Sequence, residues 1–308
     1  MSTLTVTQPQ VSSQKTRRFW LLKAAPILPG FGLSFGWSLF YISWVLLLPV
    51  AALLFYVNGL SWQEYWQAVT NPRVLQSYKV TFSAALYSTL IALVVGGLIA
   101  WVVDRYQFPG RRLLDALVDL PFALPTSVAG LTFAMLLVPS GWLGQAFAAE
   151  GWIGSHLTWM FPEGIKISYA FPGIVVAMVF TSLPFVVRTL QPVLAELHTD
   201  VEEAAATLGA TPWQRFRHVV FPFLVPALVT GGGQAFVRGL GEFGAVVMIA
   251  GNIPFKTEVT SLMIFVRLEE YNYPAAAAIA SVVLVVSLSL LFLLQWLERR
   301  LFSWQREQ

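Results

Sequence analysis

The sequence contains no cysteine, which excludes disulfide bonds, thiolate metal sites and cysteine nucleophiles. Charged residues are scarce, at 11% of 308 residues against about 25% in typical soluble domains. The three histidines, His156, His198 and His218, are scattered without ligand spacing, so no metal site is expected. No glycine-rich loop ending in lysine is present, so we expect the chain to bind neither ATP itself nor another cofactor.

Hydrophobic residues, in contrast, make up 56% of the chain. Apolar runs of 18 or more residues recur along it, and runs of this length are typical of membrane-spanning helices. We therefore expect an all-α, multi-pass membrane protein. The net charge of +3 is small and unevenly distributed, which indicates membrane topology and not nucleic-acid binding.

Six membrane-spanning helices are expected from these runs. They cover about 37–57, 80–103, 116–138, 170–190, 223–250 and 275–297. The first is long enough to span and lacks a small-residue cleavage site, so it is interpreted as a span and not as a signal peptide. Pro121 and Pro125 are expected to bend the third span. The chain is thus divided into an amino-terminal segment (1–36), one transmembrane domain (37–297) and a carboxy-terminal tail (298–308).

The basic residues orient these spans. Six spans place both termini and the connections at 104–115 and 191–222 on one side of the membrane. Thirteen of the 19 Lys and Arg residues lie on that side and five on the other, with Arg238 inside the fifth span. Because positive charge prefers the cytoplasmic side, both termini are expected to be cytoplasmic. The longest connections, 139–169 and 251–274, are then on the outer face.

A polar segment at 200–222, DVEEAAATLGATPWQRFRHVVFP, interrupts the hydrophobic sequence. Asp200 and Glu203 have the spacing of a capping box at the start of a short helix, and Gly209 could end that helix. The residues at 211–214 predict a second helix start directly afterwards. Two short helices meeting at an angle would form a compact projection for the groove of another protein. A solvated loop that happens to be helical is the alternative.

The same segment resembles the EAA motif of importer-type ABC transporter permeases. The resemblance rests on Glu203, Ala204 and Ala205, on Gly209 four residues later, and on Val219, Phe221 and Pro222. It implies that the segment is a coupling helix that seats in a cleft of a cytoplasmic ATPase subunit. The coupling residues it implies are Glu203, Ala204, Ala205, Gly209 and Pro222. Val219 and Phe221 replace the Ile and Leu of the family pattern, and both remain apolar.

Three further stretches resemble the sulfate/molybdate branch of these permeases. They are LPFALPTSVAGL in the third span, RGLGEFGAVVMIAGNIPFKTE at 238–258 and RLEEYNYPAAAAIA at 267–280. The last most resembles the T subunit of sulfate and thiosulfate permeases, so sulfate or thiosulfate is the expected substrate and molybdate or tungstate the alternative. The resemblance covers about 37–297 and implies a type I ABC importer permease domain with six transmembrane helices.

The resemblance also implies a set of partners in the cytoplasmic (inner) membrane. These are a second homologous permease subunit, two ATP-binding subunits and an extracytoplasmic substrate-binding protein, with membrane lipid around the spans. ATP hydrolysis would belong to the ATP-binding subunits, so this chain would not be an enzyme. It would form the translocation path. By alternating access, this path would open to one side of the membrane and then to the other as the ATP-binding subunits bind and hydrolyse ATP.

Three polar residues, Gln234, Arg238 and Glu242, lie inside the expected fifth span at a spacing of four, along one stripe of a helix. Charge inside a bilayer is costly, so the stripe should not face lipid. One interpretation is a translocation path, with Arg238 attracting an anion and Glu242 preventing it from binding too tightly. Another is an ion pair that only packs helices. The pair could also serve an ion-coupled secondary transporter, the main alternative from a different class.

Overall fold

The computed structural model describes residues 31–157, 159, 161–197 and 199–301. Most of the expected amino-terminal segment, most of the carboxy-terminal tail and His198 lie outside these described residues. Within them the regular structure is helical, apart from an isolated β-bridge between Ala148 and Gly164. Contacts divide the chain into two compact units, Met1–Ala51 and Ala52–Gln308, which are described separately.

Helix α1 (Phe31–Asn58) provides all the described structure of the smaller unit. It is long and apolar enough to cross a membrane and buries none of its residues within the chain. Trp37, Phe40 and Trp44 are exposed side chains that suit contact with lipid or with another membrane protein. The expected first span is therefore confirmed, beginning six residues earlier than the sequence predicted.

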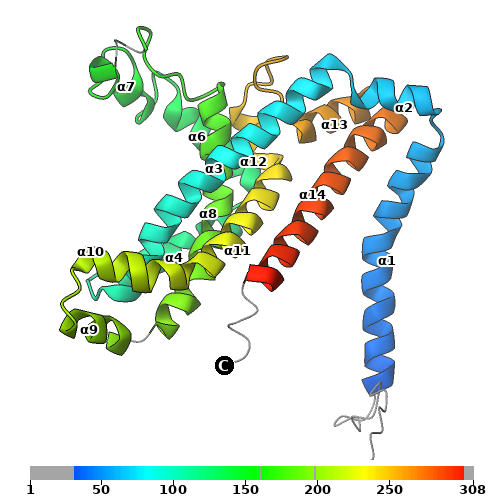
Figure 1. Cartoon of the computed structure of the whole chain (residues 1–308). Helices are drawn as coiled ribbons and strands as arrows, with labels where there is room; N and C mark the ends of the chain where they lie inside the picture. The colour runs from blue at the N-terminus through cyan, green and yellow to red at the C-terminus, as the bar shows by residue number, and fades with distance from the viewer. Residues whose placement is uncertain (1–30, 158, 160, 198, 302–308) are drawn as a thin grey trace, which may run out of the picture. The chain divides into compact units, whose positions relative to one another are not determined.

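The larger unit is built on three long helices that pack on one another, α3 (Pro72–Arg105), α8 (Phe171–Glu196) and α11 (Phe221–Leu240) (Figure 1). Helix α14 (Tyr273–Leu301) packs against α11. These helices are apolar enough to span, which confirms the expected second, fourth, fifth and sixth spans. Small buried residues on α3, including Ala84, Ala85 and Ala92, allow the helix axes to approach closely, as is common in membranes.

The expected third span is divided into three short helices, so the prediction of one continuous helix over 116–138 is wrong. They are α4 (Arg111–Val118), α5 (Leu120–Ala123) and α6 (Thr126–Leu137). The break between α5 and α6 has a local cause. Leu124 precedes Pro125, whose ring disfavours the helical conformation there, and Leu124 is extended at φ −96° and ψ 137°.

The expected fifth span differs from the prediction at both ends. It begins earlier, because α10 (Pro212–Arg215) and the π-helical turn η2 (Phe216–Val220) run without interruption into α11. It also ends earlier. The helix stops at Leu240, and a separate helix, α12 (Gly244–Ile249), follows after a short break. The prediction of one helix over 223–250 is therefore wrong.

The two broken spans pack on each other through α6 and α12. Gly130 of α6 lies directly against the backbone of Ala245 in α12, where a Cβ atom at Gly130 would collide with the Ala245 carbonyl oxygen. Only glycine allows this approach.

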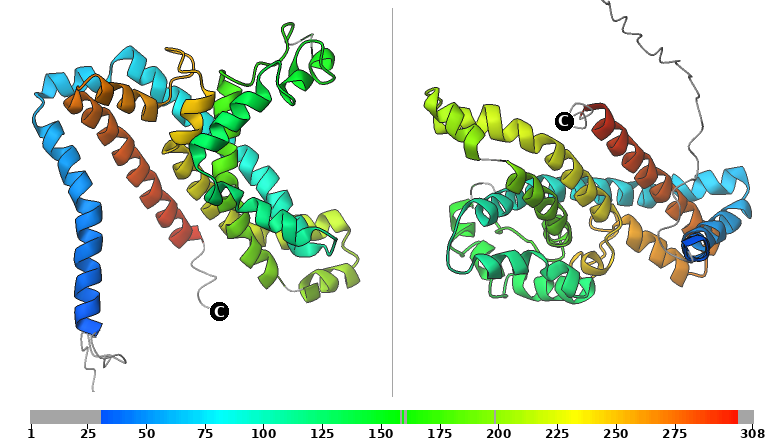
Figure 2. Two further views of the ribbon diagram at one scale, coloured as in Figure 1. Left: turned by 180° about the vertical axis from the view of Figure 1, so that it is seen from behind. Right: turned by 90° about the horizontal axis from the view of Figure 1, so that it is seen from below.

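The connections sort to two ends of the larger unit (Figures 1 and 2). Helix α4 and the short helix α9 (Thr199–Thr207) lie at one end together with α10. The connections at 104–115 and 191–222 thus share one end, as the six-span interpretation predicts.

The opposite end carries the other three connections, at 58–79, 139–169 and 251–274, and three helices that the sequence analysis did not predict. These are α2 (Trp62–Val69), α7 (Gly144–Phe147) and α13 (Thr260–Glu269), with the 3₁₀ turn η1 (Gly154–Leu157) after α7. Helix α2 begins at a capping box between Ser61 and Glu64.

Replacing Gly130 tests the contact between the two broken spans. We expect Gly130→Ala to cost about 1–3 kcal/mol of stability, because its methyl group overpacks a backbone-to-backbone contact. Thermal unfolding of the detergent-solubilised protein measures this. Gly36→Ala in α1 is the matched control, since a Cβ at Gly36 meets no atom within 4 Å. Equal unfolding temperatures for the two variants would contradict the proposed contact.

Candidate functional site

The polar segment at 200–222 forms two short helices joined at Gly209. Helix α9 ends in a pair of hydrogen bonds typical of a Schellman motif. The Ala210 N–H donates to the Ala205 carbonyl at 3.1 Å, and the Gly209 N–H donates to the Ala206 carbonyl at 2.9 Å. Gly209 has φ +83°, which confirms the predicted left-handed helix stop. Because α9 already begins at Thr199, Asp200 lies inside its first turn, and the prediction that Asp200 caps the helix is wrong.

The second helix begins as the sequence predicts. Thr211 is the N-cap of α10, its N–H donates to Gln214 Oε1 at 2.8 Å, and Pro212 occupies the first turn. The helix then continues through the π turn into α11. Pro222 has no N–H and so donates no backbone hydrogen bond in this helix. The preceding Phe221 N–H donates to the Phe216 carbonyl, five residues back, which is the hydrogen bond of a π turn.

This projection exposes apolar side chains. Helix α9 buries none of its residues, and Glu203 and Ala204 are both exposed. Leu208 is 88% exposed and Trp213 is 66% exposed. Exposed apolar side chains beside a small-residue face are typical of a surface that another protein covers.

The projection is attached to α3 by contacts that the sequence analysis did not predict. Arg105, at the end of α3, forms an ion pair with Glu202 of α9 at 2.7 Å. The Arg105 guanidinium also lies over the Trp101 ring, 5.3 Å from its centroid. No sequence spacing could have indicated a contact between residues so far apart in the chain.

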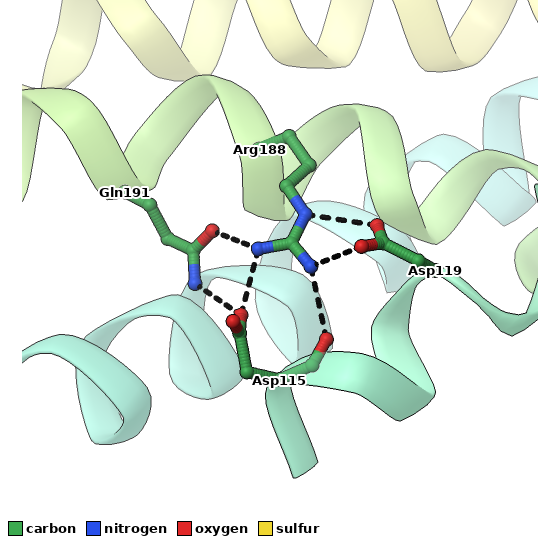
Figure 3. A network of polar contacts seen from close by, with 4 residues as sticks. All are labelled: Asp115, Asp119, Arg188 and Gln191. Carbon is green, nitrogen blue, oxygen red and sulfur yellow. Dashed lines mark hydrogen bonds and ion pairs between the residues drawn. The ribbon is translucent and has the colours of Figure 1, made fainter. Parts of the chain in front are cut away.

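A second polar cluster at the same end joins α8 to α4 (Figure 3). Arg188 of α8 donates from Nε and Nη2 to both carboxylate oxygens of Asp119, at 2.9 and 2.6 Å. Its Nη1 donates to Asp115 Oδ1 at 2.7 Å, and Gln191 donates to the same oxygen at 2.9 Å. The Gln191 amide, and then Arg188, hold the pKa of Asp115 below its usual range.

This cluster lies on the wall of a cleft of about 830 Å³ that Arg111 and Arg112 also line. The sequence analysis counted Arg188 only as a topology signal. Its geometry instead shows that it fixes the first part of the broken third span against α8.

Gln234 and Arg238 share α11, but Glu242 lies beyond the helix end, in the break before α12. The predicted stripe therefore holds for the first two residues and is wrong for Glu242. The structure still brings Arg238 and Glu242 together as an ion pair. Glu242 is 2% exposed and also accepts a 3.0 Å hydrogen bond from the Ala245 N–H in the first turn of α12.

The amino-terminal ends of α6 and α12 meet beside this ion pair. A Cβ atom at Gly244, the first residue of α12, would collide with the hydroxyl of Thr126, the first residue of α6. No side chain caps the start of α6. Helix amino-termini carry partial positive charge. The Glu242 carboxylate compensates both Arg238 and the start of α12, so the uncapped start of α6 is the positive helix end left beside the ion pair. The sequence analysis did not single out Thr126, because it treated Pro125 as a bend within one helix and not as the start of a new one.

Gln234 is exposed and the Arg238 side chain is 33% exposed in the isolated chain. The polar edge of α11 thus opens away from the packed helices of its own chain. Among the described residues, no group of three or more His, Asp or Glu could hold a metal ion.

Residues 92–303 match the family described as "binding-protein-dependent transport system inner membrane component". The chain belongs to this family. It is 55% identical over 274 residues to the sulfate transport system permease protein CysT of Escherichia coli (strain K12), covering 89% of this chain and 94% of that protein. It is 48% identical to the protein of the same name from Synechocystis sp. (strain ATCC 27184 / PCC 6803 / Kazusa), covering 87% and 90%.

A solved structure supports the fold of this inner membrane component. A chain in the crystal structure of a bacterial alginate ABC transporter, in complex with an alginate-bound periplasmic protein, superposes with a TM-score of 0.69. It shares 17% sequence identity, over 88% of this chain and 95% of that one. The predicted ABC importer permease fold is confirmed, and the chain is a multi-pass membrane protein.

Position 209 tests the shape of the projection. We expect Gly209→Val to lose amide protection at positions 209 and 210, because a left-handed conformation costs an L-residue about 1–2 kcal/mol. Gly209→Asn is the matched control, since asparagine tolerates this conformation. A Cβ at Gly209 meets no atom within 4 Å, so the two variants differ in backbone preference and not in packing. Hydrogen exchange measures the difference, and equal exchange in both would contradict the assigned turn.

Proposed function

We propose that this chain is a permease subunit of an ATP-driven importer for sulfate or thiosulfate. The observation that carries the proposal is the 55% identity to a sulfate transport system permease protein over 94% of that protein's length. A match over 274 of the 308 residues must include the polar segment at 200–222 and both broken spans. Molybdate or tungstate is the alternative substrate within the same fold.

The proposed orientation places both termini and α9 in the cytoplasm of a cell whose inner membrane the chain spans. The positive charge at this end supports it, since Arg105, Arg111 and Arg112 lie there together with Arg215 and Arg217. The partners are two ATP-binding subunits, a second homologous permease subunit and an extracytoplasmic substrate-binding protein. The ATP-binding subunits perform the hydrolysis, and this chain performs no catalysis of its own.

The projection formed by α9 and α10 is the surface on which an ATP-binding subunit docks. Glu203 and Ala204 are exposed and Ala205 is half-buried, so they provide a small-residue surface with one charge, and Gly209 sets the angle between the two helices. Pro222 lies at the π turn where the projection joins α11. Movement of the ATP-binding subunits would therefore be transmitted through the projection to α11, with which it is continuous. This transmission would drive an alternating-access cycle.

The edge of α11 that carries Gln234 and Arg238 lines the translocation path. Arg238 supplies a countercharge for a divalent anion, and the uncapped amino-terminus of α6 adds positive potential beside it. Glu242 pairs with Arg238 and so limits how tightly the anion binds, which a transporter requires because its substrate must leave again.

Reconstitution with defined substrates tests the function. The chain is assembled in liposomes with its ATP-binding subunits, its permease partner and its binding protein. We expect external sulfate or thiosulfate to stimulate ATP hydrolysis and to be taken up, with molybdate and tungstate inactive. Stimulation by molybdate or tungstate alone would contradict the substrate, and uptake driven by an ion gradient without ATP would favour a secondary transporter.

The ion pair is tested by Arg238→Gln, Glu242→Gln and the double variant. Arg238→Gln leaves the buried Glu242 unpaired, which costs about 3–5 kcal/mol, so it should lower the yield of folded protein. Glu242→Gln leaves only the partly exposed Arg238 unpaired and should lower the yield less. The double variant should fold, since glutamine can still accept the hydrogen bond from Ala245. Its uptake should fall at least about tenfold, as expected when a charged interaction of 1.5–3 kcal/mol is lost. Full uptake by the double variant would mean that the pair only packs helices.

A further inference from the structure

Helix α3 is long enough to connect the two aqueous faces of the membrane. Its 34 residues span about 50 Å at 1.5 Å per residue, against about 30 Å for the hydrocarbon core. Its only proline is Pro72, at the first turn, whereas α8 and α11 both contain interior prolines. Prolines are a main cause of helix kinks, and α3 is the one of these three helices without an interior proline.

At the end proposed to be cytoplasmic, α3 is joined to both parts of the docking projection. The side chains of Arg105 and Glu202 are only 16% and 22% exposed, so their ion pair is better shielded from water than a surface pair. Trp101, one turn earlier in α3, packs edge-to-face on Phe216, with ring centroids 6.0 Å apart. Phe216 in turn stacks on Trp213, at 5.7 Å. Helix α3 therefore holds α9 by charge and the second helix by aromatic packing.

At its other end, α3 is joined to the connection at 251–259. Arg73 donates to both carboxylate oxygens of Glu258, which is 3% exposed, with its Nε at 2.8 Å from Oε2. A two-bond pair of this kind fixes geometry as well as distance. Two turns along, the Thr260 N–H donates to the Thr81 hydroxyl at 2.8 Å. The start of α13 is thus held by two polar contacts with α3.

Helix α11 offers a less direct connection. It reaches the docking projection through a π turn, contains Pro226, and stops at Leu240 before the break that precedes α12. Among the described helices, α3 carries a charge-paired contact with the docking projection at one end and with the 251–259 connection at the other.

We propose that α3 transmits movement of the docked projection to the outer face of the chain, with Arg105–Glu202 as the attachment on the ATPase side and Arg73–Glu258 as the attachment on the outer side. This rests on the proposed function, since it assumes that an ATPase moves α9. Arg105 and Glu202 act as positioning residues. They touch neither substrate nor nucleotide, and their role is to make α3 follow α9 during the transport cycle.

The reconstituted transporter tests this through the number of sulfate ions imported per ATP hydrolysed. Glu202→Gln and Arg105→Gln should leave the ATP-binding subunits bound and hydrolysing ATP. Import per ATP should fall about fivefold or more, the lower end of typical coupling between sites. The exchanged pair, Arg105→Glu with Glu202→Arg, should recover at least half of the wild-type ratio. Glu163→Gln is the matched control. It removes the exposed ion pair between Glu163 and Lys166, which lies in the 139–169 connection at the opposite end of the larger unit.

The outcomes separate the two proposals. If the wild-type assembly imports no sulfate, the proposed function fails. If the wild type imports sulfate and both single variants keep its ratio, only the role of α3 is overturned. Loss of the ATP-binding subunits from the single variants would also overturn it, because the ion pair would then hold the docking surface and not the connection.

A distance measurement tests the movement itself. The natural chain has no cysteine, so spin labels can be placed at Leu75→Cys on α3 and Trp142→Cys in the 139–169 connection, both exposed positions. With cysteine-free partners, addition of a non-hydrolysable ATP analogue and the binding protein should shift this distance. Glu202→Gln should abolish the shift and the exchanged pair should restore it. An unchanged shift in Glu202→Gln would overturn the proposal.

Discussion

A backbone that is interrupted inside a membrane must find its hydrogen-bond partners within the protein, because lipid offers none. This constraint governs the centre of the larger unit. The interruption after α5 and the interruption after α11 lie against each other, and Gly130 lets their helices touch through the backbone. The buried Glu242 carboxylate then serves two purposes, since it bonds the first turn of α12 and neutralises Arg238.

The break before α12 also allows the charged pair Arg238 and Glu242 to lie in the membrane interior. Ser261 donates to the Glu242 carbonyl at 2.9 Å, so α13 is linked to the same interruption. The acidic side chain is enclosed by its own chain while the arginine remains accessible from outside. A path for anions that forms between this chain and a second permease subunit would therefore meet the positive member of the pair first.

The sequence was sufficient for the features that depend on local chemistry. Long apolar runs predict the spanning helices, and Gly209, Thr211 and Pro212 predict where the two short helices end and begin. It failed where packing overrides local preference. Gly239, Gly241 and Gly244 surround the stop at Leu240, but glycine is also common inside membrane helices, so the run from 223 to 250 does not by itself distinguish a break from a continuous helix. The ion pairs Arg105–Glu202 and Arg73–Glu258 join residues so distant in the chain that spacing carries no information about them.

The π turn at 216–220 has a geometric consequence for the docking projection. A π turn contains one residue more than an α-helical turn, and each residue of an α-helix rotates the chain by about 100°. The extra residue therefore rotates α10 relative to the polar edge of α11. Without it, Trp213 and Phe216 would together face a different side of α11, and Phe216 would lose its contact with Trp101 of α3. The direction in which the projection points around the α11 axis is thus set by one additional residue in a single turn.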